Sequence, residues 1–164
     1  MLNNLNNLLN TLPQQGIVEW IGLREKKREP INVVDSVEVT VEKGLLGDRY
    51  SGKLAKRQVT LIQAEHLTAI ASMLNIPECP PERLRRNIVI RGINLLALKN
   101  KQFQIGSAIL EYTGLCHPCS RMEETFGPGG YNAVRGHGGI TAQVVSDGVI
   151  QLDDKLTMIN KTEV

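Results

Sequence analysis

The sequence predicts an α+β protein rich in β-strands, folded as a barrel or a sandwich with a few helices at its rim. Many short apolar runs are separated by turn signals, whereas few segments have helical spacing. The clearest strand covers residues 33–41, where valines recur at a period of two. The chain has 164 residues, 41% of them hydrophobic and 22% charged, which suits one globular domain with its own core.

Residues 1–15 are expected to form a short N-terminal amphipathic helix. Leucines recur at helical spacing between Leu2 and Leu12, and Pro13 ends the pattern. Such a stripe packs either on the body of the protein or on a partner subunit, so association into a homo-oligomer stays open.

Strands predominate along the rest of the chain. We expect them at residues 16–23, 33–41, 58–62, 86–91, 95–98, 103–105, 108–112, 140–145, 149–152 and 156–159. Helices are expected at residues 64–74 and 121–126, with one helical turn at 81–85, and the charged residues 24–29 are expected to form a solvated loop. Asp147 and Gly148 are a strong turn signal, which predicts a hairpin between the strands at 140–145 and 149–152.

The overall charge and the cysteine count exclude several classes of protein. A net charge of +2 is too mild for a nucleic-acid-binding protein, and no apolar run reaches membrane-spanning length. The first residues lack the basic flank and the continuous apolar core of a signal peptide. Three cysteines, an odd number, argue against a disulfide framework. We therefore expect a cytoplasmic protein that binds neither nucleic acid nor membranes.

Two of the three cysteines lie in one stretch, residues 113–121. Ser120 and Glu123 fit a capping box, which would start a short helix directly after Cys119. The amide groups of a helix N-terminus and the charge of Arg121 favour a thiolate at Cys119, and a thiolate is both a nucleophile and a metal ligand. The alternative is a buried and inert cysteine.

The spacing of Cys116 and Cys119 is shared by redox dithiols and zinc sites. A thioredoxin-like motif needs a long following helix, but Gly127 interrupts this one after about two turns. A structural zinc site needs four ligands. The spare candidates, which form no second paired motif, are Cys79, His66, His117 and His137. Both interpretations stay open.

Glycine-rich polar loops follow several of the apolar runs. Residues 44–52 carry Asp48 and Arg49, and residues 127–139 carry Arg135 and His137. A basic cluster, Arg83, Arg85 and Arg86, precedes a strand. Glycine lets the backbone approach a ligand closely, and arginine binds phosphate with two parallel hydrogen bonds. A thiolate near several arginines suggests an anionic ligand with a thiophilic centre, such as molybdenum held by a phosphorylated pterin dithiolene, although copper and zinc are also thiophilic.

Four motifs, in this order, resemble those of the MOSC domain, a family named for the C-terminal part of molybdenum cofactor sulfurases. They are Gly44-Leu-Leu-Gly-Asp-Arg49, Arg86-Asn-Ile88, Cys116-His-Pro-Cys-Ser-Arg-Met-Glu123 and Gly136-His-Gly-Gly-Ile140. The resemblance spans residues 16–159 and implies a MOSC-type β-barrel with a few peripheral helices, so that residues 16–164 form a single MOSC domain. It also implies a functional cysteine at Cys119.

The resemblance further implies a protein that binds the molybdenum cofactor (molybdopterin) and reduces N-hydroxylated small molecules. Cys119 would be the catalytic residue and the metal ligand. The residues expected to bind the cofactor are Asp48, Arg49, Arg86, Asn87, Cys116, His117, Arg121, Arg135 and His137. Such a reductase needs an electron-donor protein. The alternative is a carrier of persulfide sulfur for cofactor maturation, with a sulfurtransferase as partner; a metal-free binding module is a third interpretation.

Overall fold

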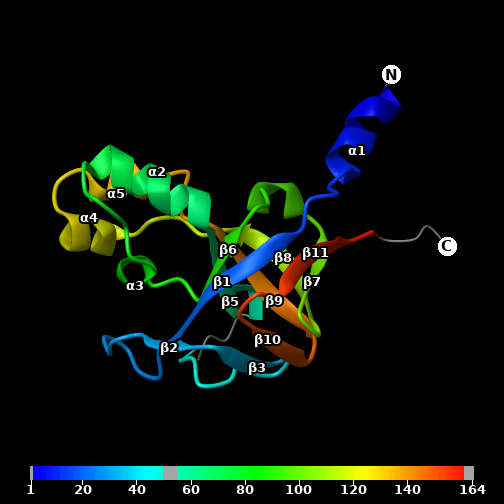
Figure 1. Cartoon of the computed structure of the whole chain (residues 1–164), viewed down its shortest axis with the longest axis horizontal. Coiled ribbons are helices and arrows are strands. Elements are labelled where there is room, and N and C mark those ends of the chain that lie inside the picture. Colours follow the sequence, from blue (N-terminus) through cyan, green and yellow to red (C-terminus); the bar gives the residue numbers. More distant parts are fainter. Residues whose placement is uncertain (1, 50–54, 161–164) are drawn as a thin grey trace.

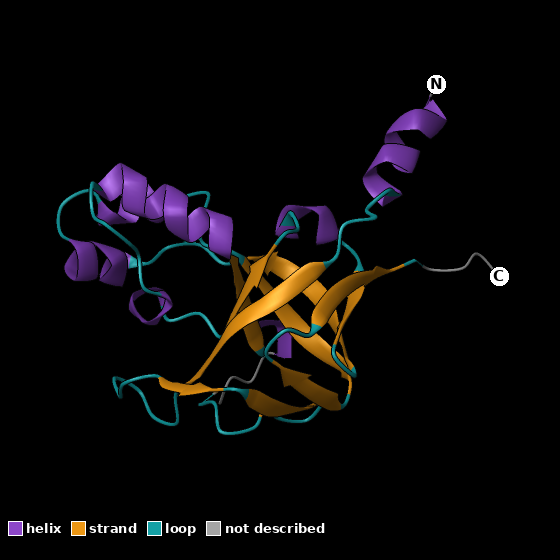
Figure 2. Ribbon diagram, viewed as in Figure 1, coloured by secondary structure: helices purple, strands orange, loops and turns teal. Residues whose placement is uncertain are grey.

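The structure, a computed structural model, describes residues 2–49 and 55–160. Its centre is a closed barrel of seven strands, drawn in Figures 1 and 2. Around the barrel the strands follow the order β1 (Gly16–Leu23), β6 (Ile88–Arg91), β5 (Val59–Gln63), β9 (Ile140–Ser146), β8 (Ala108–Leu115), β7 (Gln102–Ile105) and β11 (Lys155–Ile159). β11 pairs with β1 and closes the ring. The predicted α+β class and β-barrel are confirmed.

One strand pair explains where the helices lie. β5 and β6 are parallel, whereas the other neighbours in the barrel are antiparallel. A parallel pair needs a crossover connection. Here α2 (Ala64–Leu74) and α3 (Pro81–Leu84) supply it, and α4 (Ser120–Phe126) and α5 (Gly130–Val134) lie with them on one side of the barrel (Figure 2). Two short 3-10 helices, η1 (Ala55–Arg57) and η2 (Leu95–Leu98), and the N-terminal helix α1 (Leu2–Asn10) complete the described helices.

The core has two parts because successive residues of a strand face opposite sides. Leu61 of β5 and Ile88 of β6 belong to the cluster that fills the barrel. Their neighbours Ile62 and Val89 belong to a second cluster, formed with α2, α4 and α5. β5 and β6 are therefore covered on both faces, which is why apolar residues stand next to one another at Leu61–Ile62 and at Ile88–Ile90.

Two expected strand arrangements are wrong. The single strand expected at residues 33–41 divides at Asp35 into β2 (Asn32–Val34), which extends the main sheet beside β1, and β3 (Ser36–Thr40). β3 lies in a small second sheet between β4 (Gly44–Leu45) and β10 (Gly148–Gln151). The expected hairpin between β9 and β10 does not form because β10 pairs with β3, and the Asp147 carboxylate accepts a hydrogen bond from the Val41 amide at 2.7 Å.

Two further segments differ from expectation, whereas the N-terminal helix forms as expected. Residues 95–98 form η2 instead of a strand, because the Asn94 side chain caps it by accepting a hydrogen bond from the Leu96 amide at 3.1 Å. The stretch 127–139, expected to be a loop, contains α5. The N-terminal helix α1 (Leu2–Asn10) forms, but it projects from the barrel (Figure 1) with Leu5, Leu8 and Leu9 exposed, so it does not pack on the body through this stripe.

The expected single domain reaches residue 164 and the expected polar loop reaches residue 52, so residues 161–164 and 50–52 of these predictions lie outside the described residues. Within residues 2–49 and 55–160, no helix is long and apolar enough to span a membrane.

The loop that leads into β9 lies against β5, and this contact predicts different effects of alanine at two glycines. Gly136 and Gly139 both have positive φ, 85° and 90°. A Cβ at Gly139 would collide with the carbonyl oxygen of Leu61, whereas one at Gly136 meets no heavy atom of the described residues within 4 Å. Gly136→Ala should cost about 1–2 kcal/mol for its backbone conformation alone.

Gly139→Ala should cost a further ~1–3 kcal/mol, because the backbone of β5 or β9 must move. Urea unfolding followed by circular dichroism measures both variants against the parent protein. Equal midpoints for the two variants would contradict the close approach of Gly139 to β5.

Candidate functional site

The cysteine stretch connects the end of β8 to the start of α4. Cys116 is buried, and its amide donates a hydrogen bond to the Gly139 carbonyl at 2.8 Å. Cys119 is exposed and occupies the N-cap position of α4, where its carbonyl accepts a hydrogen bond from the Met122 amide at 2.9 Å. The predicted start of a helix directly after Cys119 is confirmed, and of the two cysteines Cys119 is the one open to solvent.

The predicted capping box at the start of α4 is wrong. The Glu123 carboxylate accepts hydrogen bonds from the amides of Gly129 and Tyr131, at 3.1 and 3.0 Å, so it does not cap its own helix. These bonds hold the pKa of Glu123 below its ordinary value, and the bond from Tyr131 has the largest effect. The carboxylate thereby fixes the start of α5 against α4, and with it the loop that carries His137.

Arg86 is buried beneath the glycine loop that precedes β9. Its Nε donates to the Gly138 carbonyl at 2.7 Å and its Nη1 to the Leu84 carbonyl at 2.8 Å. Its Nη2 is buried and has no hydrogen-bond partner among the described residues. A Cβ at Gly138 would collide with the Cys116 carbonyl and lie 3.2 Å from this Nη2. Arg86 therefore supports the loop through two of its three guanidinium nitrogens.

Asn87 joins three strands of the barrel wall. Its Oδ1 accepts hydrogen bonds from the amide and the hydroxyl of Thr60, at 3.0 and 3.1 Å, and its Nδ2 donates to the Gly22 carbonyl at 3.2 Å. Both polar atoms of the side chain are used within the fold, so Asn87 holds β1 and β5 to the start of β6.

A small pocket of about 40 Å³ lies at one rim of the barrel, and we call it the histidine pocket. It forms where β5 and β8 end and β9 begins, since Leu61 and Leu115 both pair with Ile140. Its walls are Gln63, His66, Leu95, Leu96, Leu115, Cys116, His117, Pro118, Gly136, Gly138, Gly139 and Ile140. The pocket therefore includes the residues that lead up to Cys119.

His66 and His137 are in contact at this pocket. Their ring centroids are 5.0 Å apart in an edge-on arrangement, and the His137 Nδ1 is buried without a partner in the described part of the chain. Burial lowers the pKa of His66 below its ordinary value; a charge on His137 lowers it further, and Glu65 opposes both. His66 is thus biased toward the neutral imidazole.

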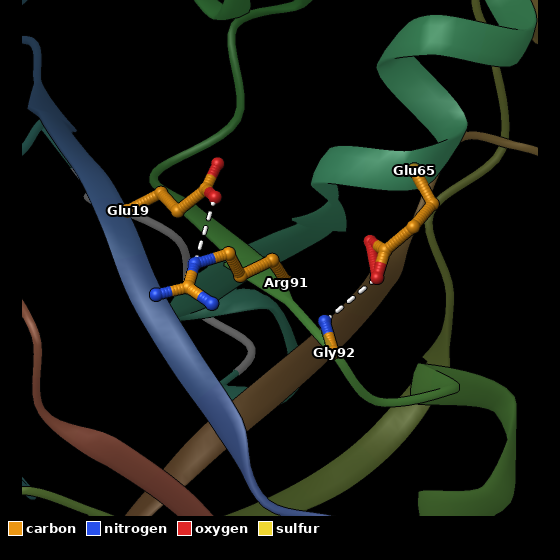
Figure 3. A network of polar contacts seen from close by, with 4 residues as sticks. All are labelled: Glu19, Glu65, Arg91 and Gly92. Carbon is orange, nitrogen blue, oxygen red and sulfur yellow. Dashed lines mark hydrogen bonds and ion pairs between the residues drawn. The ribbon is translucent and has the colours of Figure 1, made fainter.

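The first turn of α2, which carries His66, is tied to the end of β6. Glu65 Oε1 accepts a hydrogen bond from the Gly92 amide at 2.6 Å (Figure 3). The nearby pair of Arg91 and Glu19, 3.0 Å apart, is exposed to solvent and contributes little to stability. The Glu65 bond is the contact that fixes where the His66 side chain begins.

A basic groove of about 380 Å³ lies between the β1–β2 connection, α3 and α4, and we call it the arginine groove. Its walls are Arg28, Glu82, Arg83, Arg85, Arg121, Glu124 and Thr125. Arg83 is held in place, since its Nη2 donates to the Thr125 carbonyl at 2.6 Å and its guanidinium lies 4.5 Å from the centre of the Phe126 ring. Glu82 and Glu124 offset part of this positive charge, but none of the four arginines forms an ion pair with a described carboxylate.

The polar loop after β4 extends this positive surface. The Arg24 amide donates to Asp48 Oδ1 at 3.0 Å, and the Arg49 amide donates to the Arg24 carbonyl at 2.6 Å. Burial lowers the pKa of Arg24, Asp48 opposes this, and the positive charges of Arg49 and Arg121 lower it again. Arg49 and Arg121 are therefore close enough to act on the same guanidinium group.

The predicted site residues fall into two neighbouring groups. Cys116 and His117 line the histidine pocket, with His137 directly behind it. Arg121 lines the arginine groove, with Asp48 and Arg49 beside it. Cys119 lies in the chain between the two groups. The remaining predicted residues are Arg86 and Asn87, which are engaged within the fold, and Arg135, which is exposed at the end of α5.

Sequence reasoning missed several residues of these two groups. The sequence marks His66 only as a spare zinc-ligand candidate, and Gln63 carries no local signal beyond its place after a strand. Arg24 and Arg28 belong to a charged run typical of a solvated loop. The sequence marks Arg83 and Arg85 only as a basic cluster, without the helix that Arg83 packs against.

Within residues 2–49 and 55–160, no group of three or more His, Cys, Asp or Glu side chains is placed to hold a metal ion. A metal at Cys119 would therefore take most of its ligands from a source other than these side chains.

Residues 41–157, more than half of the chain, match the model of the MOSC domain family. The chain therefore belongs to the MOSC domain family. Solved structures agree in fold. The YuaD protein from Bacillus subtilis is 18% identical with a TM-score of 0.79, and the match covers 90% of this chain and 98% of that one. YiiM from Escherichia coli is also 18% identical, with a TM-score of 0.68 over 90% of this chain and 72% of that one.

YiiM from Geobacillus stearothermophilus is 15% identical, with a TM-score of 0.69 over 89% of this chain and 76% of that one. At these identities the likeness shows the fold. No curated protein matches the chain.

The burial of the cysteines predicts their order of alkylation. Cys119 is exposed, whereas Cys116 and Cys79 are buried and burial raises the pKa of the Cys79 thiol. Iodoacetamide should label Cys119 of the folded protein first, and the other two only as the structure opens. Mass spectrometry of peptides over time measures this, and labelling in urea is the control, in which all three should react. Early labelling of Cys116 or Cys79 would refute the assignment of Cys119 as the accessible thiol.

The environment of His66 predicts a pH dependence of stability. Because the pKa of His66 is lower in the folded protein than in the unfolded chain, where it is about 6.5, the unfolded chain binds the proton more tightly. The free energy of unfolding should therefore fall as the pH drops through about 6.5 and below. His66→Asn removes this titration, so its stability should depend less on pH between about 7 and 5.

Urea midpoints at several pH values measure the difference, with the exposed Thr68→Asn on the same helix as control. His137 and Glu65, the other charged groups at this position, are unchanged in both variants. Parallel pH profiles for His66→Asn and the parent protein would contradict the assigned environment.

Proposed function

We propose that this MOSC protein binds the molybdenum cofactor, with Cys119 as the metal ligand, and reduces N-hydroxylated small molecules. The observation that carries the proposal is the exposed Cys119 thiol at the start of α4, next in the chain to a groove lined by four arginines. The MOSC family is associated with the molybdenum cofactor.

The chemistry of the donor groups fits such a cofactor. A thiolate is a soft ligand suited to a thiophilic metal. One protein ligand suffices when the metal arrives with its own dithiolene ligands, which agrees with the lack of a cluster of metal-binding side chains in the described residues. Arg28, Arg83, Arg85 and Arg121 would hold the phosphate of the cofactor, because guanidinium groups bind phosphate with charge-assisted hydrogen bonds.

Support for this side of the site comes from residues that are already fixed. Arg83 keeps its position through the Thr125 carbonyl and the Phe126 ring, so little side-chain entropy is lost on binding. Arg24 and Arg49 add positive charge beside Arg121. Asp48 holds Arg24 in place through the Arg24 amide. The buried Arg86 holds the glycine loop before β9 through the Gly138 carbonyl.

Bound there, the cofactor supplies the two-electron chemistry by which an N-hydroxyl compound, two electrons and two protons give the N–H compound and water. The electrons must come from a donor protein. In this reaction the chain binds and orients the reactants and keeps Cys119 at the end of a fixed connection, between the buried Cys116 and the first turn of α4.

A second candidate function is transfer of persulfide sulfur by Cys119. The exposure of this thiol favours it, because a sulfurtransferase must reach the sulfur directly. A carrier needs no groove for a phosphate. Molybdenum and persulfide content of the purified protein separate the two functions, since stoichiometric molybdenum supports the first and persulfide without molybdenum supports the second.

Substitutions at Cys119 and Arg121 should differ in whether excess cofactor restores molybdenum binding and activity. Cys119→Ser keeps the size of the side chain but replaces a soft thiolate with a protonated hydroxyl, so the protein should fold and lose molybdenum and activity. Arg121→Ala should weaken cofactor binding roughly tenfold to hundredfold, since a charge-assisted hydrogen bond contributes about 1.5–3 kcal/mol. Excess cofactor should rescue the arginine variant only.

Metal analysis and pterin fluorescence of apo-protein reconstituted over a range of cofactor concentrations measure both effects. Lys155→Ala is the matched control, because Lys155 is an exposed cation on β11, on the opposite side of the barrel from α4 (Figure 1). A folded Cys119→Ser protein with full molybdenum content would show that Cys119 is not the ligand.

A further inference from the structure

We propose that the histidine pocket binds the uncharged end of the substrate, and that His66 positions that substrate beside Cys119. The inference rests on the proposed function and adds to it a substrate site, a charge class of substrate and a residue with a role. The observation that carries it is a pocket whose wall includes Leu115, Cys116, His117 and Pro118, the four residues directly before Cys119 in the chain.

The pocket and the arginine groove lie on the two sides of Cys119 in the chain. Leu115 and Pro118 are part of the pocket wall, Cys119 follows, and Arg121 lines the groove. In the chain, Cys119 therefore stands between residues that line an anion-binding surface and residues that line a separate pocket. The arginine groove suits a phosphate, so the pocket is left for the second reactant.

The composition of the pocket wall disfavours a ligand that carries a charge. None of its residues is Asp, Glu, Lys or Arg, so a charged group inside it would lose its hydration without gaining a counter-charge from the wall. Leucine, proline and glycine backbone make up most of the wall. The site therefore favours an alkyl or aromatic end that bears no carboxylate, phosphate or ammonium group.

The size of the pocket limits how much of the ligand enters. About 40 Å³ exceeds the ~10–15 Å³ that one water needs, but is far below the ~300–1,000 Å³ of a pocket that encloses a whole ligand. A cavity that encloses benzene measures about 150 Å³, so only a short alkyl group or one edge of an aromatic ring enters, and the rest of the molecule stays at the mouth. This places the reacting N-hydroxyl group outside the pocket, on the side of the Cys119 connection.

His66 can position this ligand without adding a charge. A neutral imidazole offers one donor and one acceptor nitrogen, and the lowered pKa of His66 favours this form. The His137 ring packs edge-on against the His66 ring, and the hydrogen bond between Glu65 and Gly92 fixes the turn that carries His66. Another part of the wall is fixed as well, since Gln63 Oε1 accepts a hydrogen bond from the Leu95 amide at 2.9 Å.

Binding of benzamide, the reduced product of benzohydroxamic acid, tests the site without turnover or metal chelation. On the full-length protein, with and without cofactor, benzamide should shift the NMR signals of the His66 ring, assigned by their loss in His66→Asn. 4-Carboxybenzamide, which adds one carboxylate to the same ring, should bind at least about tenfold more weakly, because its charge is not compensated in the pocket.

Two variants locate the binding. Leu96→Trp should block the pocket and abolish measurable benzamide binding, because Leu96 lines it yet is 49% exposed, so the larger side chain does not disturb the core. Met73→Trp on α2 is the matched control, 53% exposed and outside the pocket wall, and should bind benzamide as the parent does. Neither variant should change molybdenum content.

Kinetics with a chemical reductant test the role of His66. His66→Asn should raise the KM for benzohydroxamic acid about threefold to tenfold, the loss expected for one hydrogen bond. Molybdenum content should stay unchanged, whereas a merely structural role would alter stability without this selective change in KM.

Unchanged benzamide binding by Leu96→Trp, or equal binding of benzamide and its carboxylate, would overturn the proposal. So would loss of molybdenum from Leu96→Trp, because the pocket would then belong to the cofactor. If benzamide binds as expected but the protein holds no molybdenum, the pocket stands and the proposed function fails. If the protein holds molybdenum but does not bind benzamide, cofactor binding stands and the substrate pocket fails.

Discussion

The rest of the site depends on the buried guanidinium group of Arg86. It donates to the carbonyls of Leu84 and Gly138, and so joins the segment before β6 to the glycine loop before β9. That loop in turn contacts the Cys116 carbonyl at Gly138 and receives the Cys116 amide at Gly139. Charge-assisted hydrogen bonds in a buried setting are strong, and losing one partner leaves the other unsatisfied. The position of the cysteine connection is therefore determined by a residue some thirty positions earlier in the chain.

The two sides of the cysteine connection differ in how water and charge are arranged. On the arginine side, guanidinium groups keep partial hydration and are free of ion pairs within the described residues, which preserves their attraction for an anion. On the histidine side, apolar walls and a neutral imidazole provide no compensation for charge. Cys119 lies where these two environments meet.

The two cysteines of the motif differ in exposure because the chain leaves the barrel between them. β8 ends at Leu115, so Cys116 still lies against the barrel and is bonded to the loop before β9. Three residues later the chain has left the barrel and begins α4, whose first residue is Ser120. Burial protects the first thiol and exposure opens the second. The spacing of the pair therefore places one thiol against the barrel and the other in solvent.

The sequence by itself determined the strand-rich class, most element positions, the start of α4 after Cys119 and the family motifs, because these follow from local periodicity and short spacings. It could not determine strand pairing, since residues 33–41 satisfy the same period of two whether they form one strand or are divided between two sheets. It also could not assign Glu123, whose carboxylate can bond its own helix or the next one. Only the tertiary structure brought His66 to the cysteine connection and the arginines into one groove, because those contacts join segments that are distant in the chain and leave no local pattern.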